Sequence, residues 1–225
     1  METKKVTKIL YLLGESSVDE TFYEGVAERI TGYSFRRREI RVRPNAGYPA
    51  VCAATRLFLQ SLVRLAAEGE IFFILAVDND RVPHPWDAED RGIVREGESR
   101  YERFERELAD GLGKDRAAWP VKGALAIPVE MLESWILLAT GEKEEADLPR
   151  FSRARSVIAR EFYAPSPPPP QLKDLVKEKR YAAGYWHNEE FFLDCAHRLD
   201  PDKLAAKSPS FAYFYAQVKD WKGPR

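Results

Sequence analysis

Carboxylate side chains gather at three places in this sequence, and each place directly follows an apolar stretch. Carboxylates brought together repel one another unless a cation sits among them, and oxygen donors without Cys or His suit a hard ion such as Mg²⁺ or Mn²⁺. We therefore predict that these residues bind metal and act in catalysis. They are Glu15 after residues 9–13, Asp78 and Asp80 after residues 71–77, and Glu133, with Glu130 in a supporting role, after residues 123–129.

The spacing within two of these places points the carboxylates in a common direction. Asp78 and Asp80 are two residues apart, and side chains two apart in an extended chain lie on the same side. Glu130 and Glu133 are three apart, which places them on one face of a helix. Plainer interpretations exist, because Asp often forms turns after strands and Glu15 would be favoured near a helix N-terminus. The shared position after strands favours a metal site.

The segment after Glu15 is predicted to begin a helix. Apolar residues recur every four positions from residue 18 to residue 30, the pattern of an amphipathic helix. Ser17 and Glu20 have the spacing of a capping box, in which two side chains satisfy free amides at a helix start. Asp19 lies between them in the sequence. We expect Asp19 and Glu20 to contact the metal ligands without binding the ion themselves.

Strand and helix patterns alternate through the first part of the chain. Strand patterns cover residues 6–13, 39–43, 71–77 and 123–129, and helical patterns separate them. This alternation predicts an α/β fold with a mainly parallel four-stranded sheet flanked by helices. The carboxyl ends of parallel strands share one edge, where ligands bind in such sheets, so the carboxylates should meet there.

The pattern changes beyond residue 150. Residues 164–171 hold five prolines in eight positions and must be an extended connector, either a spacer or a ligand of the polyproline type. Three helical patterns follow it. We therefore expect an α/β domain over residues 1–150, and a connector with a helical extension packed on that domain over residues 151–225.

Composition and charge limit the classes of protein to which this chain can belong. The 225 residues are 44% hydrophobic and carry a formal charge of −1, which is typical of a globular protein. No apolar run approaches the roughly 20 residues that span a bilayer, and no targeting segment is recognisable. Cys52 and Cys195 have no partner spacing and match no zinc pattern. A cytoplasmic protein without membrane association is expected.

Basic residues suggest a surface for nucleic acid. Residues 1–150 hold 22 Lys+Arg against 27 Asp+Glu, whereas residues 151–225 hold 13 against 9. If residues 36–43 are extended, Arg37, Arg41 and Arg43 share a face, where three guanidinium groups could follow a phosphate backbone. The alternative is an edge strand that is protected by its charge.

Three stretches together resemble the Toprim domain of topoisomerases, bacterial primases and OLD-family nucleases. The stretch "ESSVDETF" supplies Glu15, Asp19, Glu20 and Phe22 at the offsets of the first Toprim motif, with Ser16 and Val18 where that motif has Gly and Thr. "LAVDND" matches the Asp-x-Asp motif. "IPVEMLESWILLA" is similar to a Glu-x-Trp segment in small bacterial Toprim-like proteins, the RloB-like proteins among them, which occur with restriction and phage-defence systems.

The resemblance implies a function and its participants. In that family the acidic residues bind Mg²⁺, and the chemistry is cleavage or transfer at phosphodiesters, so a nuclease acting on DNA or RNA in phage defence is the main expectation. An ATPase subunit would be a partner, and a homo-oligomer is left open. Two alternatives remain: a metal-dependent enzyme that acts on nucleotides, and a non-catalytic partner that an ATPase regulates.

Overall fold

The structure, a computed structural model, describes residues 8–38, 40, 47–79, 99–128, 132–140 and 172–223. Within these residues one four-stranded sheet has the order β2-β1-β3-β4, and each neighbouring pair of strands is parallel. The parallel α/β class expected from the sequence is confirmed. The strands are β1 (Lys8–Leu13), β2 (Phe35–Arg38), β3 (Glu70–Ala76) and β4 (Lys122–Ala126).

Helices connect the strands and continue beyond them. Four helices lie within the described residues 172–223, where three were expected, because the chain after Asp200 forms a short helix of its own. The Asp200 side chain accepts from the Lys203 amide at 3.1 Å at the start of that helix. The helices described are α1 (Ser17–Thr31), α2 (Tyr48–Leu65), α3 (Arg100–Leu112), α4 (Leu132–Ala139), α6 (Leu172–Ala182), α7 (Asn188–Arg198), α8 (Pro201–Lys207) and α9 (Pro209–Lys219).

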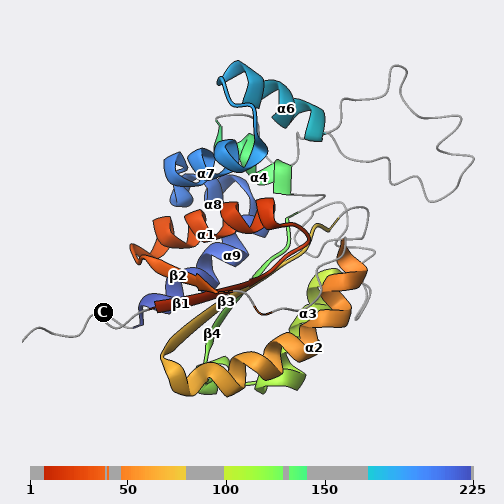
Figure 1. Ribbon diagram of the computed structural model, residues 1–225, viewed down its shortest axis with the longest axis vertical. Helices are drawn as coiled ribbons and strands as arrows, with labels where there is room; N and C mark the ends of the chain where they lie inside the picture. The colour runs from red at the N-terminus through yellow and green to blue at the C-terminus, as the bar shows by residue number, and fades with distance from the viewer. Residues whose placement is uncertain are drawn as a thin grey trace, which may run out of the picture.

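The sheet separates two hydrophobic clusters. Side chains of one strand parity, such as Leu10 and Phe72, pack with α1, α4, α7 and α9. Those of the other parity, such as Ile9 and Phe73, pack with α2 and α3. Figure 1 shows α2 and α3 below the sheet and the remaining helices above it. The strands are apolar on both faces because both faces are covered.

The second strand lies earlier in the chain than expected. We predicted it over residues 39–43, but β2 is Phe35–Arg38 and pairs with β1 from Lys8 opposite Phe35. Phe35 is anchored by edge-to-face contacts with Phe72 and Trp221, at centroid distances of 5.2 and 6.0 Å. Packing therefore fixes the start of this strand, whereas Glu39 and residues 41–46 lie outside the described residues.

The C-terminal helices belong to the same core as the sheet. Trp135 of α4 is fully buried, stacks on Phe214 of α9, and donates from Nε1 to the Ser210 hydroxyl at 2.9 Å. Helix α7 lies along α1, and α9 lies against β4. Residues 172–223 are thus packed on the α/β layer, while the predicted boundary near residue 150 and the connector 164–171 lie outside the described part.

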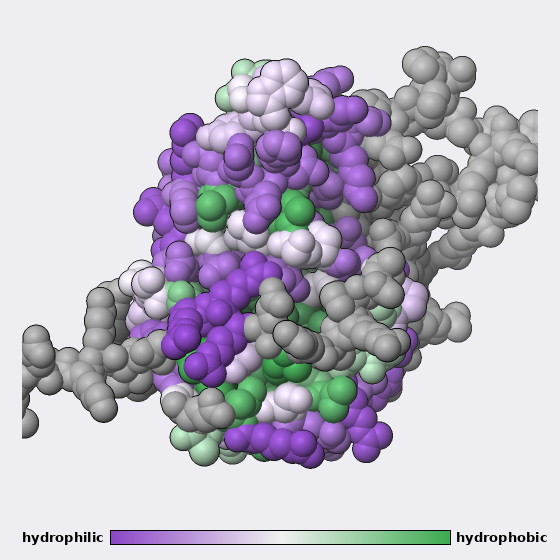
Figure 2. All heavy atoms as spheres, in the orientation of Figure 1, coloured by the Kyte–Doolittle hydropathy of each residue, from purple (hydrophilic) through white to green (hydrophobic). Residues whose placement is uncertain are grey.

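Part of the molecular surface, over β2, is strongly hydrophilic. Figure 2 shows hydrophilic side chains gathered over β2, where Arg36, Arg37 and Arg38 follow one another. Among the described helices, none combines the length and apolar character needed to cross a membrane.

Candidate functional site

The site lies where β1, β3 and β4 end. Glu15 follows β1, Asp78 follows β3, and Glu133 lies in the first turn of α4, after β4. The Asp78 amide donates to Glu15 Oε1 at 3.0 Å, and the Leu132 amide donates to Asp78 Oδ1 at 2.9 Å. Asp78 therefore links the loop after β1 to the start of α4. The strand ends bring together Glu15, Asp78 and the start of α4.

Four carboxylates affect one another here. Burial raises the pKa of Asp78 well above its ordinary value, and the negative charges of Asp19, Glu133 and Glu15 raise it further. Burial also raises the pKa of Asp19 and of Glu133. The same four charges add to burial in raising the pKa of the enclosed Tyr23 hydroxyl. Charges that act on Asp78 and Tyr23 in this way belong to groups at the same end of the sheet.

Asp19 and Glu20 have different roles, although they are adjacent. The N-cap of α1 is Ser16, not Ser17, and its hydroxyl accepts from the Asp19 amide at 3.2 Å. The expected Ser17–Glu20 capping box is therefore wrong, because the helix begins at Ser17, one residue earlier than that motif requires. Asp19 affects the carboxylate cluster, whereas Glu20 accepts from the Gly14 amide at 3.2 Å.

Arg37 is engaged by acidic groups of α1. Its guanidinium forms an ion pair with Glu20 and lies 3.7 Å from Glu24 Oε2. This arrangement joins β2 to α1, so the observed partners of Arg37 are carboxylates within the chain. Four other predicted site residues, Asp80, Glu130, Arg41 and Arg43, lie outside the described residues.

Two cations at this edge were missed by the sequence analysis. Arg100 Nη1 lies 3.9 Å from Glu15 Oε1 and donates to the Asp78 carbonyl, and the guanidinium lies over the Tyr48 ring at 3.9 Å. Lys173 counters the effect of burial on the pKa of both Asp19 and Glu133.

Both cations stand in the first turn of a helix, Arg100 in α3 and Lys173 in α6. The helix dipole disfavours positive charge at that end. A Lys or Arg in the first turn of a predicted helix could therefore have indicated acidic groups close by.

The donor set can be tested against a hard divalent cation. Carboxylate oxygens are the ligands that Mg²⁺ and Mn²⁺ prefer, and burial together with neighbouring carboxylates raises the pKa of both Asp78 and Glu133. Within the ranges that the structure describes, no three Asp, Glu, His or Cys side chains are close enough to form a ready-made metal cage. The chemistry of the donors fits the ion, and Asp80, the remaining member of the predicted set, lies outside those ranges.

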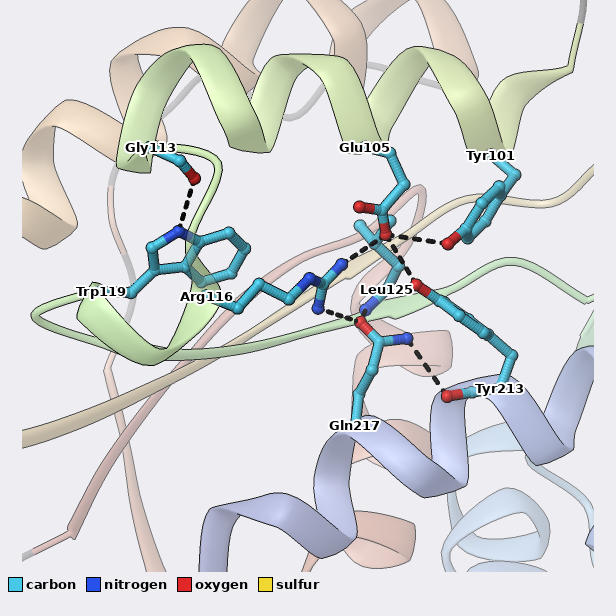
Figure 3. Close-up of polar contacts among 8 residues, drawn as sticks. All are labelled: Tyr101, Glu105, Gly113, Arg116, Trp119, Leu125, Tyr213 and Gln217. Atoms are coloured by element: carbon cyan, nitrogen blue, oxygen red, sulfur yellow. Dashed lines mark hydrogen bonds and ion pairs between the residues drawn. The ribbon is translucent and has the colours of Figure 1, made fainter.

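A second polar cluster joins α9 to α3 and, through the Leu125 amide that donates to Gln217, to β4 (Figure 3). Glu105 Oε1 accepts from the hydroxyls of Tyr101 and Tyr213, at 3.0 and 2.7 Å, and pairs with Arg116. Burial and the Glu105 charge raise the pKa of Tyr213 to about 12. Gln217 Oε1 accepts from Arg116 at 2.7 Å. Each polar group named here is satisfied by another, so we interpret the cluster as structural.

A pocket of about 750 Å³ borders this cluster. Its lining includes Lys122 and Gly123 at the start of β4, and Trp221. It therefore lies at the amino end of the strand, opposite the carboxylates, whereas ligands of parallel sheets bind at the carboxyl ends. Lys122 is already engaged, since it donates to Glu70 and to the Trp221 carbonyl.

Comparison with models of known protein families, with curated proteins and with solved structures finds no match to this chain.

Proposed function

We propose that this protein is a nuclease that cleaves nucleic-acid phosphodiesters with the help of Mg²⁺ or Mn²⁺ at the carboxylate site. The observation that carries the proposal is the convergence of Glu15, Asp19, Asp78 and Glu133 at the carboxyl end of the sheet, with mutual repulsion among them. Burying like charges together is costly, and a fold that does so commonly uses the site for binding or catalysis.

Each residue has a role that follows from its contacts. The Asp78 amide and Arg100 hold Glu15 at the end of β1. The Leu132 amide fixes Asp78 Oδ1, so this carboxylate cannot rotate freely. Glu133 lies one residue further on the same helix. These rigidly held oxygens would bind the ion, which when bound would neutralise the phosphodiester and lower the pKa of a water.

Glu20 offers a matched control. It is a carboxylate on the same helix as Asp19, but it is occupied by Arg37 and the Gly14 amide. Replacing Glu20 by Gln should therefore leave cleavage unaffected, whereas Asp78→Asn and Glu133→Gln should abolish it. All three changes preserve side-chain shape and remove one charge.

The test is cleavage of labelled single- and double-stranded DNA and RNA by the full chain in Mn²⁺, with EDTA as the blank and circular dichroism as the folding control. We expect cleavage of at least one substrate by wild type and by Glu20→Gln only. Folded Asp78→Asn and Glu133→Gln proteins that cut at the wild-type rate would remove both residues from the site. A wild type that cuts none of the four substrates would refute the nuclease proposal and favour a non-catalytic partner.

A further inference from the structure

The turn between α6 and α7 displays two aromatic rings to solvent. Trp186 is 78% exposed and Tyr181 is 47% exposed, and their rings meet edge to face at a centroid distance of 6.0 Å. Two exposed aromatic rings in contact form one apolar surface, on which a partner can pack. In Figure 1 this end of α6 projects from the body of the molecule.

The turn is held in place by a buried arginine. Arg180 is only 7% exposed, donates to the carbonyls of Trp186 and Tyr185, and lies over the Tyr181 ring at 4.3 Å. Gly184 permits the turn by adopting a positive φ of 85°. The rings are therefore presented on a constrained backbone, which lowers the entropic cost of binding a partner.

Two lysines of α6 lie between the carboxylates and these rings. Lys173, Lys177 and Tyr181 are exposed and recur every four residues, so they lie along one side of α6. Lys173 and Tyr181 are eight residues apart, about 12 Å along the helix axis. The adjacent row holds Asp174 and Glu178. Helix α6 nevertheless has a net positive charge, because Lys179 and Arg180 add to the two lysines.

The amino end of α6 reaches the carboxylate site. Helix α6 packs against α4, and Leu172 is buried in the same cluster as the apolar side chains of α4. Lys173, the next residue, acts electrostatically on both Asp19 and Glu133. The surface of α6 thus connects the carboxylates directly to the exposed rings.

We propose that α6 and the turn after it guide a single-stranded stretch of nucleic acid to the carboxylates, with phosphates along Lys173 and Lys177 and bases stacked on Tyr181 and Trp186. This inference rests on the proposed function and names its substrate class. Aromatic rings stack on any base of a single strand, whereas the bases of a duplex are already stacked on each other. Cations beside the rings complement the phosphates.

The test measures binding without chemistry. Fluorescence anisotropy in EDTA is recorded for the full chain with a labelled oligothymidylate of about 20 nucleotides and with a duplex of the same length. Wild type should prefer the single strand. Trp186→Ala should weaken that binding about tenfold, and Trp186→Phe should restore most of it. Lys177→Ala should weaken binding and reduce the slope of log K against log salt by about 0.7.

Two variants serve as matched controls. Leu57→Ala removes an exposed apolar side chain from α2, on the opposite face of the sheet, and Lys203→Ala removes an exposed cation from α8. Both should bind like wild type. A folded Trp186→Ala protein with wild-type affinity overturns the proposal, as does equal affinity of wild type for duplex and single strand. A Trp186→Ala change that alters only the oligomeric state assigns the rings to an interface between copies and overturns it too.

The nuclease proposal and the proposal for α6 can be refuted independently of each other. A wild type that binds the single strand in EDTA, with binding weakened in Trp186→Ala, but cuts nothing in Mn²⁺ supports the path along α6 and refutes the nuclease. A wild type that cuts, with binding and cutting unchanged in Trp186→Ala, supports the nuclease and refutes the path.

Discussion

The amide of Asp78 donates a hydrogen bond of 3.0 Å to Oε1 of Glu15, across 63 positions of sequence. The bond forms because β1 and β3 are parallel neighbours with Leu13 opposite Leu75, so the loops that follow them start side by side. The Asp78 side chain in turn accepts from the first residue of α4. One residue therefore sets the relative positions of two carboxylate-bearing segments.

Asp78→Asn should stabilise the metal-free protein at neutral pH. Burial and neighbouring carboxylates raise the pKa of Asp78 in the folded state above its ordinary value of 3.8, so its contribution to stability is complete below that value and is lost as pH rises through the raised pKa. Asn cannot ionise and keeps the acceptor for Leu132. The stability of the variant relative to wild type should increase as the pH rises from about 4 to about 7, as measured by urea unfolding in EDTA.

Glu70 provides the control of opposite sign. Burial favours its neutral form, but hydrogen bonds from Lys8 and Lys122 outweigh burial and lower its pKa below 4.5. Ionised Glu70 therefore stabilises the folded protein at pH values above its ordinary pKa of 4.5, and this stabilisation is lost as the pH falls through the lowered pKa. Glu70→Gln should destabilise the protein at neutral pH and much less in acid. If Asp78→Asn shows the same trend with pH as Glu70→Gln, the raised pKa of Asp78 is wrong.

Mn²⁺ should raise the melting temperature of the wild type, because an ion bound only by the folded state stabilises it in proportion to the logarithm of its concentration. At about 100 times the dissociation constant the gain is about 2.7 kcal/mol. Asp78→Asn and Glu133→Gln should lose this response, and Glu20→Gln should retain it. Scanning calorimetry over a series of Mn²⁺ concentrations measures the effect. An equal response in all four proteins would place the ion elsewhere.

Arg37→Ala should reduce stability by about 1 kcal/mol, because it leaves Glu20 and Glu24 of α1 without the ion pair that joins them to β2. Arg36→Ala, on the exposed side of the same strand, should change stability by less than about 0.5 kcal/mol. Urea unfolding of both variants decides between a structural and a phosphate-binding role for Arg37. A role in binding predicts the reverse: unchanged stability and weaker affinity for nucleic acid.

Gly123→Ala should destabilise the sheet by about 2–3 kcal/mol. A Cβ at this position of β4 would lie 2.1 Å from Cζ of Phe73, and the ring stacks on Trp119 at a centroid distance of 6.5 Å. The ring cannot move without disturbing that contact. Thermal unfolding measures the loss, and adding Phe73→Leu to Gly123→Ala should recover part of it. A variant with wild-type stability would show that the ring has room to shift.

The order of strands and helices was available from the sequence because it depends on local periodicity. The apolar run over residues 71–77 predicted a strand, and β3 (Glu70–Ala76) is that strand. The alternation with helices then predicted that the strands are parallel. Parallel strands in turn predicted that the carboxylates that follow them lie at one edge of the sheet.

Only the tertiary structure decided which charged groups meet. Asp19 and Glu20 are adjacent in sequence, but the rotation of α1 on the sheet directs one to the carboxylate cluster and the other to Arg37. The reach of Arg100 to Glu15, and of Lys173 to Asp19, depends on how distant segments pack. Periodicity specifies the face on which a side chain lies, but contacts across tens of residues are fixed by the fit of whole side-chain layers, which no local pattern encodes.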